Sequence, residues 1–183
     1  VWVKPADLGG YKELFRKEDG DRRVLFSFQH GGTILSFGLN VHGYIECDAP
    51  INPTQILDGA WHHCAATFDG RRMVVYLDGQ EVGSRPRTGE LTAGGTAPGC
   101  IGSADGSECF AGTMDELRIF SRPLRSVEMT ELYRRGRAAL ATHARQVQER
   151  LRTVYALKDS LAETLAACRK NLWEKGLQRD TEL

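Results

Sequence analysis

The stretch that decides the fold is Trp61-His62-His63-Cys64-Ala65-Ala66-Thr67-Phe68-Asp69-Gly70. A second stretch, Val75-Tyr76-Leu77-Asp78-Gly79, follows it closely. Each is a short, largely apolar run that ends in Asp-Gly, a pair that suits tight turns because both residues tolerate a positive φ. The two stretches therefore predict neighbouring antiparallel strands joined by hairpin turns, and Trp61 is expected to anchor the core behind them.

The same pattern of short strands and frequent turns extends up to about residue 121. Asp-Gly and Gly-Gly pairs recur at the 8–12-residue spacing that is typical of a sandwich or barrel. Cys47 and Cys64 fall on apolar strand positions and are expected to be buried. Alternation of side chains predicts strands at Val24–Phe28, Ile34–Leu39, Met73–Leu77 and Leu117–Phe120.

Further motifs follow in a fixed order: Ile101-Gly102, then Phe110-Ala111-Gly112-Thr113-Met114-Asp115-Glu116-Leu117-Arg118-Ile119-Phe120, then Arg122-Pro123-Leu124. Together with the opening stretches, this order resembles the laminin-G-like jelly-roll family of the concanavalin A-like lectin/glucanase superfamily over roughly residues 1–133. The resemblance implies a mainly β protein, an antiparallel sandwich. Gly112 suits a place where strands pack closely.

The beginning of the chain also bears on this resemblance. Trp2-Val3-Lys4-Pro5 is similar to an early strand of the family, and the family has one or two strands before it. We therefore expect residues 1–121 to form a sandwich whose N-terminal strands are missing, a condition that would leave an edge and part of the core exposed.

Residues 122–183 are predicted to form a linker and a long amphipathic helix. Ser126 is a plausible N-cap, and Glu128 stands in the first turn, where a carboxylate favours the helix dipole. Apolar residues then recur in 4-3 steps without a slip, apart from Lys158, as in a coiled coil or bundle. The expected interface, with the same segment of another chain or with a helix of a larger parent protein, comprises Leu140, Val147, Leu151, Val154, Leu161, Leu165 and Leu172. Ala141, Tyr155, Leu157 and Ala162 widen the stripe.

Composition argues against several classes of protein. Twenty-four basic residues balance 24 acidic ones, so the chain lacks the basic surface that nucleic-acid binding and polybasic membrane anchoring require. No apolar run approaches the ~20 residues that span a bilayer, and no signal peptide is present.

Cys100 and Cys109 are the cysteines closest in sequence. A turn at Ala104-Asp105 would pair residue 103 with 106 and Cys100 with Cys109, which places the two side chains opposite each other. In an oxidising compartment this register predicts a disulfide. The alternative is two separate thiols on one strand face.

Candidate ligand contacts are His30, Asn40, His42 and Tyr44, because sugars favour aromatic faces together with amides and imidazoles. The alternative is that these are solvated residues of loops and strand edges. No hydrolase or nucleotide fingerprint is present. Glu46 and Asp48 have the alternate spacing of glycosidase carboxylates, but the segment resembles no glycosidase motif, so it is interpreted as the polar outer face of a strand. We therefore expect no enzyme activity.

The resemblance also implies a structural Ca²⁺ at Asp115, the matching position in some laminin-G-like domains; otherwise Asp115 orients the closing strand through backbone hydrogen bonds. No other cofactor is expected. These observations predict a carbohydrate-binding module of a larger bacterial protein that is extracellular, periplasmic or in the cell envelope. The alternative is a structural or protein-interaction module that associates through the C-terminal helix.

Overall fold

The computed structural model describes residues 1–92 and 94–180, with helix side chains described up to Lys175. The chain divides into two compact units, Val1–Arg134 and Arg135–Leu183. The first holds all the strands and the first turns of the long helix, and the second holds the rest of that helix. The last strand ends at Asp115 and the long helix begins at Ser126, whereas the boundary between the two units comes later. Residues 181–183 of the expected 122–183 segment lie outside the described residues.

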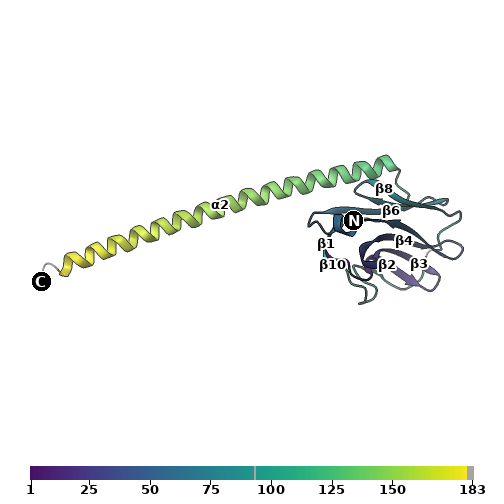
Figure 1. The fold of residues 1–183 in the computed structure, drawn as a ribbon, viewed down its shortest axis with the longest axis horizontal. Helices are drawn as coiled ribbons and strands as arrows, with labels where there is room; N and C mark the ends of the chain where they lie inside the picture. Colours follow the sequence, from purple (N-terminus) through teal and green to yellow (C-terminus); the bar gives the residue numbers. More distant parts are fainter. Residues whose placement is uncertain (93, 181–183) are drawn as a thin grey trace. The chain divides into compact units, whose positions relative to one another are not determined.

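Within the described residues, ten strands form two five-stranded sheets, with orders β10-β1-β6-β7-β8 and β5-β4-β3-β2-β9 (Figure 1). The elements are β1 (Trp2–Asp7), β2 (Lys12–Asp19), β3 (Arg22–Gln29), η1 (His30–Gly32), β4 (Ile34–Asn40), β5 (Tyr44–Pro50), α1 (Pro53–Ile56), β6 (His62–Phe68), β7 (Arg72–Leu77), β8 (Gln80–Pro86), β9 (Gly99–Ile101), β10 (Ala111–Asp115) and α2 (Ser126–Asp180). Every strand pairing is antiparallel. The predicted antiparallel sandwich, followed by a long helix, is confirmed.

The core lies between the two sheets and draws side chains from both. Phe26 and Phe37 meet edge to face there, with ring centroids 6.2 Å apart. Cys47 and Cys64 are buried, as predicted. The expectation for Trp61 was wrong: it is only half-buried and precedes β6, whereas Trp2 is the tryptophan buried in the sandwich.

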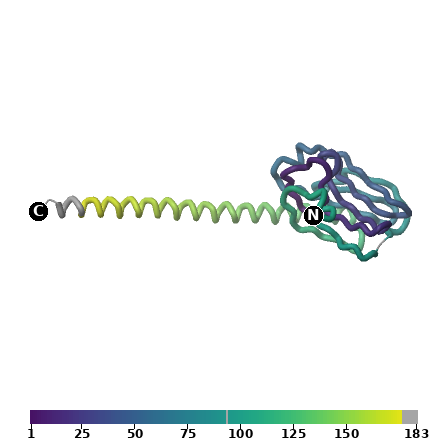
Figure 2. Tube along the Cα trace, turned by 90° about the horizontal axis from the view of Figure 1, so that it is seen from below, coloured from purple at the N-terminus to yellow at the C-terminus, as the bar shows by residue number. Residues whose placement is uncertain are grey.

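Strand β1 is paired on both sides, with β10 along one edge and with β6 along the other. In Figure 2 the N-terminus accordingly lies beside the teal-green chain of the last strands. Gly112 of β10 fits because a Cβ there would lie within 2.4 Å of the Lys4 carbonyl oxygen, so the predicted close approach is present.

The predicted strand at Leu117–Phe120 was wrong, because β10 ends at Asp115. Glu116 has a φ of 52°, which breaks the extended path directly after β10. Ile119 is consequently 72% exposed.

The first turns of α2 cover the outer face of the sheet that contains β6 and β7. Met129 is 2% exposed and packs with Val74 and Tyr76 in a second hydrophobic cluster. The Arg125 backbone N–H donates to Glu128 Oε2 (2.9 Å), which satisfies a donor just before the helix. The predicted N-cap, Ser126, is instead the first helical residue.

The remainder of α2 has a different environment. Every residue from Ala141 to Lys175 is exposed, including those of the predicted interface in this range. None of the described helices combines the length and apolar character that crossing a membrane requires.

Candidate ligand-binding face

The second sheet, β5-β4-β3-β2-β9, turns a row of polar side chains away from the core. Along β3, Val24, Phe26 and Phe28 enter the core, so the residues between them face outward. Cross-strand pairing aligns Ser27 with Ser36. We call this surface the polar face and define it by Glu13, Arg16, Glu18, Arg23, Ser27, Gln29, Ser36, Tyr44, Glu46 and Asp48. Among the described residues, the two hydrophobic clusters are the core and the cluster beneath α2, and neither covers this face.

Tyr44 provides the aromatic surface of the polar face. It is 39% exposed, and its hydroxyl donates to Glu46 Oε1 at 2.5 Å. The guanidinium carbon of Arg23 lies 4.3 Å from the ring centroid, a cation–π contact. Gly38 leaves room for the ring, because a Cβ there would collide with the Tyr44 hydroxyl. Burial, followed by the bond to Glu46, raises the pKa of Tyr44, so the phenol stays protonated.

Hydroxyl, amide and carboxylate groups lie beside this ring. Ser36 Oγ donates to Asp48 Oδ1 at 2.6 Å, and Asp48 itself is exposed. Gln29 Nε2 donates to Ser27 Oγ and to Glu46 Oε1 at longer distances, 3.4 and 3.5 Å. Ser27, Gln29 and Ser36 are themselves buried, and their bonds hold the carboxylates of Glu46 and Asp48 in place. The face therefore presents an exposed ring and carboxylate acceptors fixed by bonds within the sheet, groups that can recognise a hydroxyl-rich ligand.

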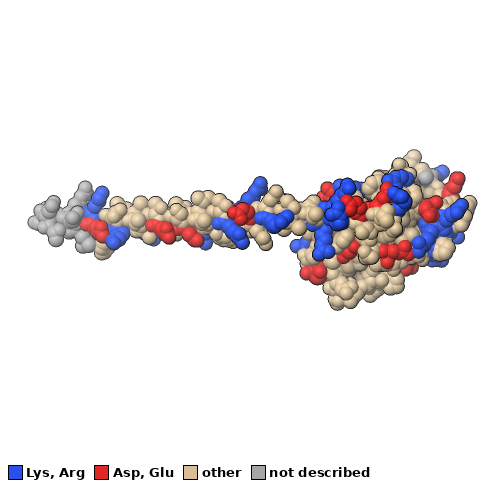
Figure 3. All heavy atoms as spheres, turned by 90° about the horizontal axis from the view of Figure 1, so that it is seen from above, with Lys and Arg blue, Asp and Glu red and all other residues tan. Residues whose placement is uncertain are grey.

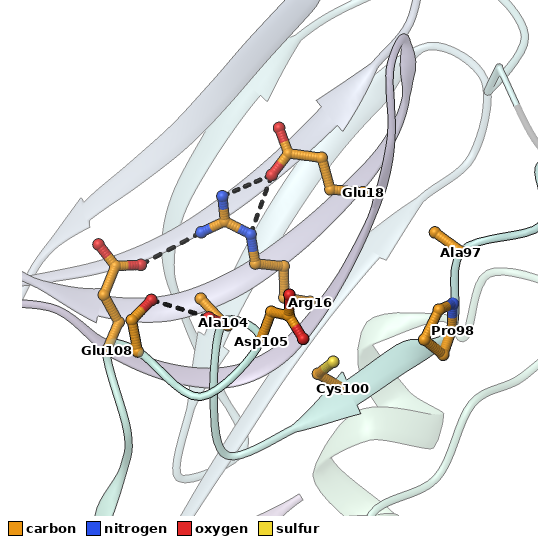
Figure 4. A pocket seen from close by; sticks show the side chains of 9 residues that line it. Arg16, Glu18, Ala97, Pro98, Cys100, Ala104, Asp105 and Glu108 are labelled. Atoms are coloured by element: carbon orange, nitrogen blue, oxygen red, sulfur yellow. Dashed lines mark hydrogen bonds and ion pairs between the residues drawn. The ribbon is translucent and has the colours of Figure 1, made fainter.

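Arg16 lies at the β2–β9 side of the same face, next to a cavity of about 390 Å³ (Figure 4). Its guanidinium bonds to Glu18 and, at 3.2 Å, to Glu108. Figure 4 shows Arg16 between these two carboxylates. The residues that line the cavity are Arg16, Glu18, Ala97, Pro98, Cys100, Ala104, Asp105, Ser107 and Glu108.

Glu13 is the most deeply buried acid of the polar face, at 2% exposure. One carboxylate oxygen accepts from Arg16 at 3.1 Å, and the other has no hydrogen-bond partner among the described residues. Burial raises the pKa of Glu13 to about 7, with Glu108 adding to the effect and Arg16 opposing it. Near neutral pH this carboxyl can therefore either donate or accept a hydrogen bond.

The structure does not bring the four predicted ligand residues together. His30 follows β3 at the end where Gln29 pairs with Ile34, whereas Asn40 ends β4 at the opposite end of that hairpin. Asn40 is buried, and its Oδ1 accepts from the Gly43 N–H at 3.1 Å. His42 is an exposed turn residue with a φ of 52°. Asn40 pairs with Tyr44 and lies on the same face of β4 as Ser36, so these two residues lie together at one end of the polar face, with His42 in the turn between them.

The register expected around Cys100 and Cys109 was wrong. Ala104 bridges to Ser107, two positions out of the predicted register, and the Phe110 N–H donates to the Gly102 carbonyl at 2.8 Å. Gly102, rather than Cys100, is therefore level with residues 109 and 110. Both cysteines are free thiols in this structure, so the geometry behind the predicted disulfide is not present.

Asp115 forms a backbone hydrogen bond at the end of the closing strand, which was the alternative to a Ca²⁺ ligand. Its Oδ1 accepts from the Glu116 backbone N–H at 2.7 Å, which orients the end of β10. Ca²⁺ needs six to eight oxygens. In the part of the chain that the structure describes, no group of three or more acidic, histidine or cysteine side chains could hold a metal ion. The residues around Asp115 do not fit a calcium site.

Two five-stranded antiparallel sheets with one helix-covered face and one polar face define a jelly-roll β-sandwich of the lectin type. The family profile described as the Concanavalin A-like lectin/glucanases superfamily matches residues 1–129, and the chain belongs to this family. No curated protein gave a significant match.

Several solved structures are similar. The CBM40 of the Ruminococcus gnavus IT-sialidase is 12% identical, with 73% of this chain and 79% of that chain covered and a TM-score of 0.59. Domain 4 of AbnA, a GH43 extracellular arabinanase from Geobacillus stearothermophilus solved with arabinotriose, is 26% identical, with coverage of 72% and 63% and a TM-score of 0.56. The SAP-like pentraxin from Limulus polyphemus is 20% identical, with coverage of 70% and 65% and a TM-score of 0.52. The CBM40 and the pentraxin, at these identities, have the same fold as this chain.

Proposed function

We propose that the sandwich is a non-catalytic module that binds glycan chains through the polar face. The observation that carries this proposal is the contrast between the two outer faces of the sandwich. One is apolar and covered by the first turns of α2, whereas the other is polar: its Tyr44 and Asp48 are exposed, and its Ser27 and Ser36 are buried. A polar face built of paired donors and acceptors beside an exposed ring suits a ligand rich in hydroxyl groups.

The similar structures support the same class of ligand. The arabinanase domain was solved with arabinotriose, and another neighbour is a CBM40. The arabinanase is an extracellular enzyme, and this supports an extracellular location for the present chain as part of the proposal.

Tyr44→Ala tests the site directly. The experiment is a screen of neutral and acidic oligosaccharides, followed by calorimetric titration with those that bind. We expect Tyr44→Ala to weaken binding at least about tenfold, equivalent to about 1.4 kcal/mol, because it removes the exposed ring and its hydroxyl. Tyr44→Phe should retain most of the affinity if the ring surface dominates.

Tyr11→Ala is a matched control. Tyr11 is 43% exposed, close to the value for Tyr44, but its ring contacts His30 at 5.5 Å, at the far end of the sheet. Binding that is lost in Tyr11→Ala and kept in Tyr44→Ala would move the site to His30. Failure to bind any glycan would overturn the proposal, and slow cleavage of a bound oligosaccharide would overturn its non-catalytic part.

A further inference from the structure

Helix α2 carries an apolar stripe whose side chains are exposed to solvent from Ala144 onward. We define the helix stripe as Leu140, Ala144, Val147, Leu151, Val154, Lys158, Leu161, Leu165, Cys168 and Leu172. Leu151 is 49% exposed, Leu161 61% and Leu172 71%. On the helix side seen in Figure 3, uncharged surface runs between scattered charged groups. Apolar surface this continuous usually marks an interaction site.

The length of the stripe is sufficient for a stable interface. At 1.5 Å per residue, its 33 residues from 140 to 172 extend over about 50 Å. A strip about 10 Å wide then covers about 500 Å² on each helix, or about 1,000 Å² for a pair, which reaches the lower bound of specific interfaces. A 3.5-residue repeat also selects a partner with the same repeat, because each knob must enter a hole of the facing helix.

The spacing of the stripe is symmetric about residue 156. If a second copy runs antiparallel about this point, each stripe residue faces the one whose number completes a sum of 312, and the flanking residues on either side meet with sums of 310 or 314. The paired layers are Leu140 with the partner's Leu172, Ala144 with the partner's Cys168, Val147 with the partner's Leu165, Leu151 with the partner's Leu161, and Val154 with the partner's Lys158. The two smallest positions meet each other, and leucine or valine meets leucine in the layers on either side.

Lys158 decides between the two directions of pairing. In a parallel, in-register pair it would face the partner's Lys158, and two like charges would share one layer. In the antiparallel pair it faces the partner's Val154, and the two ammonium groups are offset along the axis by about 6 Å, four residues at 1.5 Å each. The antiparallel arrangement therefore weakens the one like-charge repulsion of the stripe.

The residues that flank the stripe favour the same arrangement. Antiparallel pairing brings Tyr155 beside the partner's Tyr155 and Leu157 beside the partner's Leu157, at the centre of the interface. Both side chains are largely exposed in the single chain, at 60% and 65%. The outer flanking pairs combine His143 with the partner's Asn171, Arg150 with the partner's Thr164, and Ala141 with the partner's Arg169, so no like charges meet.

We propose that residues 140–172 form an antiparallel, two-stranded interface with a second copy of this chain, centred on residue 156. This proposal is independent of glycan binding, so either can fail without the other. The occupant is a second copy because it alone supplies, by symmetry, the complementary layers and flanks described above.

Cross-linking of the full chain tests the direction of pairing. Cys100→Ser with Cys109→Ser leaves Cys168 as the one exposed thiol of the five cysteines, since Cys47 and Cys64 are buried. In the antiparallel pair the two Cys168 side chains are about 36 Å apart, 24 residues at 1.5 Å. A short bismaleimide should therefore yield no cross-linked dimer in this background. Adding Ala144→Cys should yield one, and the matched control Ala156→Cys, on the opposite helix face, should not.

Sedimentation across concentration tests the association itself. Leu151→Asp with Leu165→Asp should weaken dimerisation at least about tenfold, whereas Thr142→Asp with Ala156→Asp, on the outer face, should leave it unchanged. Lys158→Leu should strengthen it roughly tenfold, because it replaces the one charged position of the stripe. Cross-linking through Cys168 alone, a trimer or tetramer, or a wild type that stays monomeric would each overturn the proposal.

Discussion

His62 lies between two aspartates at the start of β6. Its Nδ1 is 2.9 Å from Asp78 Oδ2, and its Nε2 is 3.1 Å from Asp58 Oδ1. The hydrogen bond with Asp78 is the main reason that the pKa of His62 is raised, against the opposing effect of burial. Burial alone would raise the pKa of Asp78, but bonds from His62 and from the His63 N–H hold it below its usual value. The imidazolium therefore ties the β7–β8 turn to the segment before β6.

This contact should make the stability of the sandwich depend on pH above neutrality. The folded-state pKa of His62 lies above the unfolded value of about 6.5, so its contribution is complete below that pH and is lost as pH rises through the folded pKa. We expect His62→Gln to cost about 1.5–3 kcal/mol near pH 6 and progressively less at higher pH. Urea unfolding of both proteins over a pH series measures this difference. A difference that stays constant from pH 6 to 10 would contradict the ion-pair explanation.

His63, the next residue, should act in the opposite direction. It is 2% exposed against Trp2 and Tyr133, and burial lowers its pKa to about 4. Its contribution is complete above the unfolded pKa of about 6.5 and is lost as pH falls towards 4. Through His63, the wild type should lose up to about 3 kcal/mol of its free energy of unfolding as the pH falls, at 1.36 kcal/mol for each pKa unit. We expect His63→Phe to abolish this loss. Equal acid sensitivity in wild type and variant, by the same urea series, would rule this out.

The individual residues of the polar face were harder to predict from the sequence than the Asp-Gly hairpin turns. Tyr44 was recognisable as an exposed aromatic residue among amides and imidazoles. Its partner Arg23 was not, because it lies far away in sequence and only the register of β3, β4 and β5 brings it over the ring. Glu46 did carry a signal: in Tyr44-Ile45-Glu46-Cys47-Asp48, polar residues alternate with residues that face the core. Glu13 carried no such signal, because the bulge in β2 changes the alternation beside it.

At the scale of elements, alternation predicted β3, β4 and β7, where each strand lies between two others. It failed at Leu117–Phe120, whose pattern is suitable but which follows the break in the extended backbone at Glu116. The long helix was evident from composition alone, because residues 137–175 contain neither Pro nor Gly. Sequence does not show which side of the first helical turn contacts the sheet, since Val127 and Met129 are both apolar and only Met129 is buried.

Met129 is therefore the residue with which to test the attachment of α2 to the sheet. We expect Met129→Ala to lower the free energy of unfolding by about 2–5 kcal/mol, because it empties a buried position against Val74 and Tyr76. Val127→Ala is the control: Val127 is 65% exposed in the same turn, and its truncation should change stability by no more than about 0.5 kcal/mol. Chemical denaturation followed by tryptophan fluorescence compares the two. Equal effects would mean that the cluster does not stabilise the fold.

At the scale of the whole molecule, stability has two separate sources. The unit Val1–Arg134 has its own hydrophobic core, whereas Arg135–Leu183 is helix whose described side chains from Ala141 onward are exposed. An isolated helix gains little from backbone hydrogen bonds alone, so in the proposed dimer the second unit is stabilised by burial of the helix stripe against the second copy. Such burial depends on protein concentration, and the core of the sandwich does not.

Thermal unfolding should consequently show two transitions. The helical signal in far-ultraviolet circular dichroism should fall at a midpoint that rises with protein concentration. Fluorescence from Trp2 and Trp61, isolated by Trp173→Phe, should report a later transition that is independent of concentration. In the Leu151→Asp, Leu165→Asp variant, the first transition should move to lower temperature while the second stays within about 2 °C, because the substitutions lie outside the sandwich. A single transition common to both signals, at a midpoint unaffected by concentration, would show that α2 and the sandwich unfold as one cooperative unit.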